Sequence, residues 1–561
     1  MGGSVGYYCR PMSPFRSASL YSTAVVCGLL ALGSSRAAAK NPNIVYVMAD
    51  DLGIGDVACY GGDRCQTSTP AFDSLARDGM MFTDAHSVAS VCVPSRIAIM
   101  TGRYAWRFAK PSQSGPWGFL NPQLPAGAFT LGTMLKRAGY RTGYVGKWHL
   151  GTLMHTKDGR NQGVDNVDYE RPLKVGPNDF GFDYSFILPG SLDMYPYVFA
   201  RNGRFQGEVT ARKGWSAFNR VGPAAEDFED YKVLDTFAAE AEAFLDRNAE
   251  QARNGRPFFL YVALTSPHTP TSPSPAFEGS SKLGLYGDFV EETDATLGRV
   301  LAALDKHRLA DNTLVVATSD HGAAPYAGNV RKATPNLIRK LEPLGHYASG
   351  IYRGYKFTLY EGGLRVPFLV RWPGRVEPGS QCHGLVGLND MAATVAEIAN
   401  FELAPGEAPD SISILPLLTS PSTSSPRTSL VMQSPLAFAI RHRQWKLALT
   451  PGSGSRGMWG TLPIPEQAWG DAMRSFGSAP TAADLRKAPF VQLFNLDTDV
   501  RETKNVASDR PEVAARLAAL LDKTVADGRS TPGPALENDV PGVELHRNSV
   551  QWLERYSGTG Q

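Results

Sequence analysis

The chain has 561 residues, of which 43% are hydrophobic, 10% aromatic and 20% charged, a composition typical of folded globular proteins. Intrinsic disorder is therefore excluded as a description of the whole chain. The 56 Lys and Arg residues nearly balance the 54 Asp and Glu residues, giving a formal charge of +2. Nucleic-acid-binding proteins and polybasic membrane-surface proteins carry a larger positive surplus, so we expect no nucleic acid as a partner.

The first 39 residues have the pattern of a secretory signal peptide. Arg10 and Arg16 precede an uncharged stretch over 20–33, and small residues follow it up to Ala39. The apolar run is shorter than the ~20 residues that span a bilayer, and no later stretch is long and apolar enough to do so. We expect an exported protein, periplasmic, extracellular or lysosome-like, with no membrane span.

The next part of the chain alternates predicted strands and predicted helices. Strands are predicted at 44–48, 141–145, 258–264, 313–318 and 367–371. Helices are predicted from Pro70 to Gly79 with Thr69 as the cap, between Thr130 and Gly139, and over 285–307. This alternation indicates an α/β domain with a mostly parallel sheet that helices cover on both faces.

A second, smaller unit is predicted after a tract rich in Ser, Thr and Pro. This tract, 419–429, has no apolar periodicity and is interpreted as a linker or a surface loop. Short strands at 437–440, 445–449 and 491–495 and a helix over 511–526 follow it and predict an α+β subdomain. The predicted organisation is a signal peptide over 1–39, an N-terminal domain over 40–425 and a C-terminal subdomain over 426–561.

Polar pairs follow two of the predicted strands. Asp50 and Asp51 come after the strand at 44–48, and Asp320 and His321 come after the strand at 313–318. In open α/β sheets, ligands bind beyond the carboxyl ends of the strands. Adjacent carboxylates repel each other unless a cation lies between them, most simply a hard divalent ion with oxygen ligands. One such pair is more often a helix cap or a loop acid, but two in one domain favour a metal site.

Cys92 precedes a predicted helix that Pro94 helps to begin. The thiol would then lie at the positive end of the helix, where anions are stabilised. A small buried cysteine, with Arg96 in a surface ion pair, explains the local sequence equally well. Cys59 and Cys65 are near enough in the chain to pair in an oxidising compartment, and the sequence leaves this open.

Residues 92–96 and 100–103 together resemble the C-x-P-S-R…T-G-R signature of the sulfatases, members of the alkaline-phosphatase-like superfamily. The family's other motifs follow in its own order. They resemble the segments 50–53, 146–151, 266–270, 319–322, 353–356, 360–367 and 493–496, with Glu502 and Asn505 after the last. The resemblance covers roughly residues 42–522.

The resemblance implies a fold and a function. The fold would be an α/β, alkaline-phosphatase-like sandwich with a large, mostly parallel mixed sheet flanked by helices, and a small C-terminal α+β subdomain. The function would be a secreted, calcium-dependent sulfatase that hydrolyses the sulfate ester of a carbohydrate or aryl alcohol, with residues 40–425 as the catalytic domain. Its partners would be a small-molecule or glycan sulfate ester and the maturation enzyme that generates formylglycine.

In sulfatases the signature cysteine is oxidised to formylglycine, and its hydrated form, a gem-diol, is the nucleophile. The reaction then passes through a sulfo-enzyme intermediate. The resemblance assigns this modification to Cys92. It also implies that Ca²⁺ is held by Asp50, Asp51, Asp320, His321 and the modified Cys92. Many members have Asn at position 321, and histidine is a poor Ca²⁺ ligand on grounds of hardness. His321 therefore either ligates the ion or only hydrogen-bonds the sulfate.

The other catalytic roles follow from the same resemblance. Arg96 would orient the formylglycine hydrate, and Lys147 and Lys356 would contact the sulfate and the leaving oxygen. His149 would take a proton from the diol as sulfate is expelled, and His268 would protonate the leaving alcohol.

Two alternatives accompany this interpretation. A phosphomonoester or phosphonate ester hydrolase of the same superfamily would have a similar site, although the signature and the single charge of a sulfate ester favour a sulfatase. A non-catalytic, glycan-binding relative is the other alternative, and the presence of every expected catalytic residue argues against it. Ser191, in the segment 188–193, occupies the place of a polar sulfate contact in some members.

Overall fold

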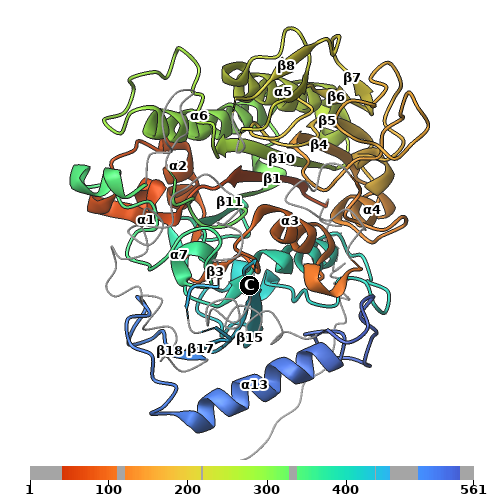
Figure 1. The fold of residues 1–561 in the computed structure, drawn as a ribbon. Helices are drawn as coiled ribbons and strands as arrows, with labels where there is room; N and C mark the ends of the chain where they lie inside the picture. Colours follow the sequence, from red (N-terminus) through yellow and green to blue (C-terminus); the bar gives the residue numbers. More distant parts are fainter. Residues whose placement is uncertain are drawn as a thin grey trace, which may run out of the picture. The chain divides into compact units, whose positions relative to one another are not determined.

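The computed structural model builds the chain around a ten-stranded mixed sheet of order β13-β2-β12-β11-β1-β10-β4-β5-β6-β7 (Figure 1). The residues that it describes are 41–109, 121–215, 219–326, 338–435, 437–450, 452–454 and 491–543. The predicted signal peptide lies outside these residues.

Parallel strands form the middle of this sheet. They are β11 (Thr313–Ser319), β1 (Asn43–Asp50), β10 (Phe258–Pro267), β4 (Arg141–Lys147) and β5 (Tyr184–Leu188). The outer strands are β12 (Phe368–Arg371), β2 (Met80–Phe82), β13 (Ser380–Cys382), β6 (Ala200–Arg201) and β7 (Arg204–Phe205). The five predicted strands are confirmed as β1, β4, β10, β11 and β12, and β5 is an additional one.

The side chains of β1 alternate between two hydrophobic cores, as the period of a strand requires. Val45 and Val47 belong to the core on one face of the sheet, and Tyr46 and Met48 belong to the core on the other. Both faces are buried, which explains why the strand reads as a continuous apolar run.

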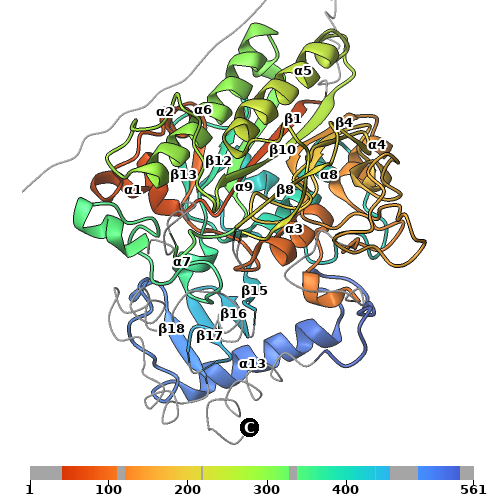
Figure 2. The same cartoon turned by 45° about the horizontal axis from the view of Figure 1, so that its top comes forward.

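Helices cover both faces of the sheet, as predicted. The first core contains residues of α2 (Pro70–Asp78), α5 (Val233–Arg253) and α6 (Leu285–Lys306). The second contains residues of α3 (Cys92–Thr101), α4 (Leu131–Arg137) and α8 (Met391–Ile398). Figure 2 shows α5 and α6 running side by side over their face. The architecture is therefore α/β, with a mixed sheet between two helical layers.

The start of α2 corrects one detail of the sequence analysis. Thr69 is at the expected cap position, but its side chain makes no capping hydrogen bond. Instead Asp294 of α6 accepts hydrogen bonds from the backbone N–H groups of Ala71, at 3.0 Å, and Phe72, at 2.9 Å. A carboxylate distant in sequence thus replaces the local cap. Thr130 does cap α4, as predicted.

A four-stranded antiparallel sheet follows the large sheet in the chain. Its strands are β15 (Ser429–Gln433), β16 (Phe438–His442), β17 (Trp445–Ala448) and β18 (Gln492–Asn495), and the helix α13 (Pro511–Ala526) packs against them. The sequence analysis missed β15, which begins where the Ser, Thr and Pro-rich tract ends. The domain boundaries at 39/40 and 425/426 stay predictions.

Buried charges join the small sheet to the large-sheet region, and we call them the interface cluster. Its members are Asp84, His86, Glu361, Arg365, Lys446 and Glu502. Lys446 Nζ lies 2.9 Å from Glu361 Oε1 and 2.9 Å from Glu502 Oε1. Burial opposes ionisation of Glu361, but the cations around it outweigh burial and hold its pKa well below the usual value.

All four cysteines in the described part of the chain are free thiols, including Cys59 and Cys65. The disulfide that the sequence left open is therefore not formed in this structure. None of the described helices combines the length and apolarity that a membrane span requires.

Candidate active site

Predicted site residues gather at the carboxyl edge of the parallel strands. Asp50 ends β1 and Lys147 ends β4, while His268 directly follows β10 and Asp320 directly follows β11. Because these strands are parallel and paired in register, their carboxyl ends meet at one edge of the sheet. All four side chains are at most 3% exposed.

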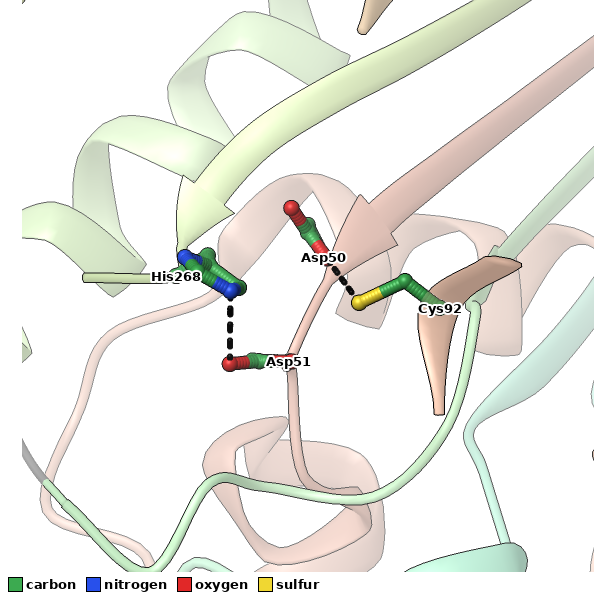
Figure 3. Close-up of side chains that lie close together, drawn as sticks. All are labelled: Asp50, Asp51, Cys92 and His268. Carbon is green, nitrogen blue, oxygen red and sulfur yellow. Dashed lines mark hydrogen bonds and ion pairs between the residues drawn. The ribbon is translucent and has the colours of Figure 1, made fainter. Parts of the chain in front are cut away.

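Cys92 enters this edge as the first residue of α3, after Val91 in extended backbone. Its Sγ lies 3.6 Å from Asp50 Oδ1 and 3.2 Å from His321 Nε2. Figure 3 shows Cys92 and His268 converging on the neighbouring residues Asp50 and Asp51 from two other segments of the chain. Burial raises the pKa of the Cys92 thiol well above its usual value, so the unmodified side chain is a neutral thiol.

The donor atoms of these side chains lie within 4.8 Å of one another in two overlapping groups. One group is Asp50, Asp51, Cys92 and His268, and the other is Asp50, Cys92, Asp320 and His321. Asp51 Oδ2 is buried and has no hydrogen-bond partner in the described part of the chain. A buried set of carboxylates with an unused oxygen is a donor set that fits a hard divalent cation.

Each of the three carboxylates is paired with its own cation. Lys147 Nζ lies 2.5 Å from Asp50 Oδ2, and Lys356 Nζ lies 2.7 Å from Asp51 Oδ1. Arg96, one turn after Cys92 on α3, places Nη2 at 3.0 Å from Asp320 Oδ2. Burial raises the pKa of Asp50, but Lys147, His268 and Arg96 outweigh burial, so the pKa falls well below its usual value.

His321 has a defined tautomer. Its Nδ1 lies 3.0 Å from the backbone oxygen of Gly322. A carbonyl oxygen only accepts hydrogen bonds, so Nδ1 carries the proton and Nε2 presents its lone pair. That lone pair faces Asp51 Oδ1 at 3.4 Å and Asp320 Oδ1 at 3.6 Å. A neutral imidazole held in this way has the form that ligates metals.

His149 is buried, and neither of its ring nitrogens has a hydrogen-bond partner in the described part of the chain. Burial, with Lys147 and Arg96 nearby, lowers its pKa well below the usual 6.5. The ring is therefore neutral at physiological pH and can accept a proton. Its left-handed backbone, with φ of 53°, is a costly conformation for a residue other than glycine.

Gly146, directly before Lys147, is a position at the end of β4 that requires glycine. Its φ is +120°, and a Cβ atom there would lie 1.8 Å from the backbone oxygen of Ala263 in β10. Only glycine permits this close approach of β4 to β10. The approach fixes the direction in which the next side chain, Lys147, leaves the sheet.

Comparisons with known proteins agree with this geometry. Residues 42–401 match the family model for Sulfatase. The N-acetylgalactosamine-6-O-sulfatase of Bacteroides thetaiotaomicron is 32% identical over 521 residues, which cover 86% of this chain and 93% of that protein. The chain belongs to the sulfatase family. The steryl-sulfatase of Rattus norvegicus is 36% identical over 422 residues, covering 67% of this chain and 70% of the relative. This sulfatase is therefore a sulfuric ester hydrolase.

A solved structure with a similar fold supports the same family assignment. It comes from work on the metabolism of multiple glycosaminoglycans by Bacteroides thetaiotaomicron, and it superposes with a TM-score of 0.71 at 31% identity. The match covers 86% of this chain and 99% of the solved chain. The alkaline-phosphatase-like architecture expected from the sequence is confirmed.

The sequence analysis missed one buried pair in this sulfatase, Asp193 with Arg220. Asp193 Oδ2 lies 2.8 Å from Arg220 Nη1, and Asp193 Oδ1 lies 3.9 Å from His268 Nδ1. Asp193 follows β5, in the same segment as Ser191, whose buried Oγ has no hydrogen-bond partner among the described residues. The aromatic and β-branched run Tyr184–Leu188 was the signal that could have revealed this fifth strand end.

Proposed function

We propose that this protein is a formylglycine-dependent sulfatase that acts on the sulfate ester of a carbohydrate or aryl alcohol. The observation that carries the proposal is the position of Cys92, at the start of a helix and among three paired carboxylates. Oxidation of its thiol to an aldehyde supplies, after hydration, a hydroxyl group that attacks the sulfur atom. Arg96 lies one helical turn further along the same face and orients this side chain.

We propose Ca²⁺ as the metal. Asp50, Asp51 and Asp320 provide the hard oxygen atoms that Ca²⁺ prefers, and Asp51 Oδ2 is an unused donor among them. The bound ion would supply positive charge that polarises the ester and neutralises the carboxylates. His321 is the fourth ligand from the protein, because its Nε2 lone pair faces two of these carboxylates. The same lone pair leaves Nε2 without a proton to donate to sulfate, which favours ligation over the hydrogen-bonding alternative.

Lys147 and Lys356 bind the sulfate group. Both side chains are buried and end beside the metal-binding carboxylates, close to Cys92. Negative charge builds up on the bridging oxygen as the S–O bond breaks, and fixed cations in a site without water stabilise that charge strongly. Their ion pairs with Asp50 and Asp51 hold both ammonium groups in place beforehand.

The two histidines carry the proton transfers. His149 is the base, because burial and neighbouring cations keep its imidazole neutral. His268 is the acid that protonates the leaving alcohol. Its Nδ1 donates to the backbone oxygen of Thr269 at 2.6 Å, so the proton that it gives to the alcohol is one carried on Nε2 in the doubly protonated ring, and Nε2 faces Asp51 and the site. Asp51 and Asp193 flank the two ring nitrogens.

We infer that the natural substrate is a sulfated carbohydrate. A relative that aligns over most of its length is an N-acetylgalactosamine-6-O-sulfatase, and the solved structure comes from work on glycosaminoglycan metabolism. We further propose that residues 1–39 direct export, that a formylglycine-generating enzyme is a partner, and that the catalytic domain and C-terminal subdomain divide at 425/426.

Two measurements test the proposal. Mass spectrometry of the Cys92 peptide, after expression with a maturation enzyme, should show aldehyde in place of thiol. Activity should then appear on sulfated oligosaccharides and an aryl sulfate, and be far weaker on an aryl phosphate. Cys382→Ala is the matched control, because Cys382 is also a buried free thiol but lies in β13.

Other results would contradict the proposal in distinct ways. Full activity with an unmodified Cys92 would remove the nucleophile assignment. A preference for the aryl phosphate would support the phosphoester or phosphonate hydrolase. Binding of sulfated oligosaccharides without any hydrolysis would support the non-catalytic relative.

A further inference from the structure

A cavity of about 360 Å³ lies at the amino end of β4. It is away from the catalytic cluster, which is the name we give to Asp50, Asp51, Cys92, His149, His268, Asp320 and His321. Its lining residues are Arg141, Tyr184, Phe244, Arg247, Asn248, Gln251 and Arg256. Arg141 begins β4 and Lys147 ends it. At about 3.3 Å per residue, the strand places the two ends about 20 Å apart. The cavity therefore belongs to the opposite edge of the sheet and has no part in the chemistry proposed above.

The cavity has more cations than carboxylate partners. Arg141 Nη1 lies 3.5 Å from Asp183 Oδ2, but Asp183 also pairs with Lys136 at 2.9 Å. Within the described ranges, neither Arg247 nor Arg256 forms an ion pair with a carboxylate, and Arg256 Nη1 donates instead to the neutral Gln251 Oε1 at 3.4 Å. Two guanidinium groups beside one concave surface, without carboxylates to neutralise them, form a site for an anion.

Aromatic rings hold one of these arginines in position. The Arg247 guanidinium lies 4.7 Å from the centre of the Tyr184 ring, at cation–π distance. The Phe244 ring packs where β4 has only a glycine: a Cβ on Gly143 would lie 2.5 Å from Phe244 Cε2. The aromatic wall is thus fixed against the sheet. Its arginine is oriented before any ligand arrives, which lowers the entropy cost of binding.

The remaining lining groups indicate the class of ligand. Asn248 Nδ2 donates to the backbone oxygen of Phe244 at 2.7 Å, and Gln251 Oε1 accepts from Arg256 Nη1 at 3.4 Å. The amide atoms that can exchange hydrogen bonds with the hydroxyl groups of a ligand are therefore Asn248 Oδ1 and Gln251 Nε2, and guanidinium groups bind sulfate or carboxylate in a bidentate manner. Aromatic walls with a few polar groups are typical of small-molecule sites, and the volume lies at the lower end of their range. Cations, amides and aromatic rings together match a sugar that carries an anionic group.

A second cavity, of about 310 Å³, provides a contrast. It also contains an arginine, Arg299, but this side chain pairs with Asp235 at 2.6 Å and with Glu242 at 2.8 Å. Its guanidinium charge is therefore already neutralised. The two cavities are similar in size, but the second is lined by the carboxylates Asp235 and Glu292 as well as by Arg299 and Lys232, whereas the first is lined by three arginines and no carboxylate. The first is therefore better suited to an anion.

We propose that the cavity at the start of β4 binds an anionic sugar unit of a polymeric glycan and acts as a second, non-catalytic site. This inference rests on the sulfated-carbohydrate substrate proposed above. A polymer held at this edge would stay near the enzyme between turnovers, which raises the effective concentration of its other sulfate groups at the catalytic edge.

The test compares Arg247→Ala/Arg256→Ala with Arg299→Ala, in the full mature chain. Migration of the Cys92→Ala form of each is measured in gels that contain chondroitin sulfate, dextran sulfate, hyaluronan or neutral dextran. We expect at least about a tenfold weaker affinity of the double variant for one or both of the sulfated polymers, and no change for Arg299→Ala. Hyaluronan carries carboxylates without sulfate, so it shows which anion the cavity prefers.

Kinetics complete the test with enzyme that retains Cys92. The double variant should raise KM on chondroitin sulfate and leave turnover of an aryl sulfate unchanged. If the double variant and Arg299→Ala migrate equally in the gels of every anionic polymer, the inference is wrong and the proposed function is unaffected. A further gel contains DNA in place of the glycan. If the double variant loses affinity for DNA and for the glycans equally, the inference is also wrong, because the arginines would then attract any polyanion. Absence of turnover on any sulfate ester would instead count against the proposed function.

Discussion

The interface cluster and the catalytic cluster of this sulfatase are both buried and charged. They differ in how many of their polar atoms have no hydrogen-bond partner among the described residues. In the interface cluster, Glu361 binds Lys446, His86 and Arg365 at 2.7–2.9 Å, so both of its oxygens are paired. Two atoms of this cluster have no hydrogen-bond partner within the described ranges, but one of them, Glu502 Oε1, still lies 2.9 Å from Lys446 Nζ, and the other is His86 Nδ1. In the catalytic cluster, Asp51 Oδ2 and both nitrogens of His149 have no hydrogen-bond partner in the described part of the chain. Burying a polar atom without a partner is costly. Such atoms are more numerous in the catalytic cluster, which favours it as the cluster that a ligand completes, whereas most charges of the interface cluster are paired and form a structural joint.

The largest expected effect is the loss of activity on replacing the nucleophile. Cys92→Ala should lower kcat/KM by about 10⁴-fold or more, because no other group can form the bond to sulfur. Its free energy of unfolding, measured with urea, should stay within about 1 kcal/mol, since a small neutral side chain is lost. A large loss of stability together with retained activity would make this cluster structural and break the comparison.

Lys446→Met should show the opposite pattern. It leaves Glu361 and Glu502 buried without their shared cation, and removing one partner of a buried pair costs about 3–5 kcal/mol. Activity of the folded protein should change only a few-fold. Lys523→Met is the control: its ion pair with Asp527 on α13 is exposed, so we expect less than about 0.5 kcal/mol. If both variants unfold at the same urea concentration, the interface cluster does not hold the small sheet in place.

The two catalytic histidines should separate by substrate. His268→Ala should slow sugar sulfates, whose alcohols leave poorly, by at least about 10²-fold more than nitrophenyl sulfate, which leaves without a proton. His149→Ala should release a burst of alcohol and then turn over slowly, because a base is needed after the ester bond has broken. Rapid-quench kinetics on both esters distinguishes these patterns. Equal losses on both esters for His268→Ala would assign it to sulfate binding alone.

The number of metal ions bound per chain also distinguishes the two clusters. Asp84, His86 and Glu361 also have the spacing of a metal site, but they offer two carboxylates where the catalytic cluster offers three, and Arg365 and Lys446 surround them. We therefore expect one Ca²⁺ per chain. The free energy of unfolding should be about 3 kcal/mol lower in chelated protein than in protein saturated with calcium, and the melting temperature should fall accordingly.

Asp320→Asn should abolish this response to chelation, because it removes a ligand from the catalytic cluster. Lys446→Met should keep it. Two ions per chain, or zinc in place of calcium, would revive the phosphoesterase alternative.

The smallest expected effect is in the pH dependence of stability. The pKa of His149 is lowered in the folded state by burial and nearby cations, so below about pH 6.5 the unfolded chain binds a proton that the folded chain does not. Stability is then lost as the pH falls, by at most about 1.4 kcal/mol per pH unit for this residue. His149→Gln should flatten urea-unfolding curves measured from pH 7 to pH 5 in metal-free protein. His383→Gln, at an exposed position, should not.

The sequence was sufficient to predict residues that belong to local motifs. Asp50, Lys147 and Asp320 could be placed because each stands at the end of an apolar run, and parallel strands end at one edge. Cys92 could be placed because a proline marks the start of its helix. These inferences depend on chemistry within a few residues of each position.

Partners that come from distant segments could not be predicted. Asp294 replaces Thr69 as the cap of α2 from more than 200 residues away. Asp193 meets Arg220 from across a segment that includes β6 and β7, and Lys446 meets Glu361 only once two sheets have packed together. Such pairs depend on tertiary packing, which a single sequence without homologues does not reveal.

If Cys92 is converted to formylglycine, as we propose, its burial in the folded protein limits the time available for that modification. The thiol is 3% exposed and is enclosed by His321, which follows it by 229 residues. At about 5–20 residues per second, a ribosome needs roughly 10–50 s to add that length of chain. During that interval Cys92 can still be reached by a modifying enzyme, and afterwards the closed sheet edge covers it. Synthesis speed, rather than the amount of folded protein, would then set the fraction of active molecules.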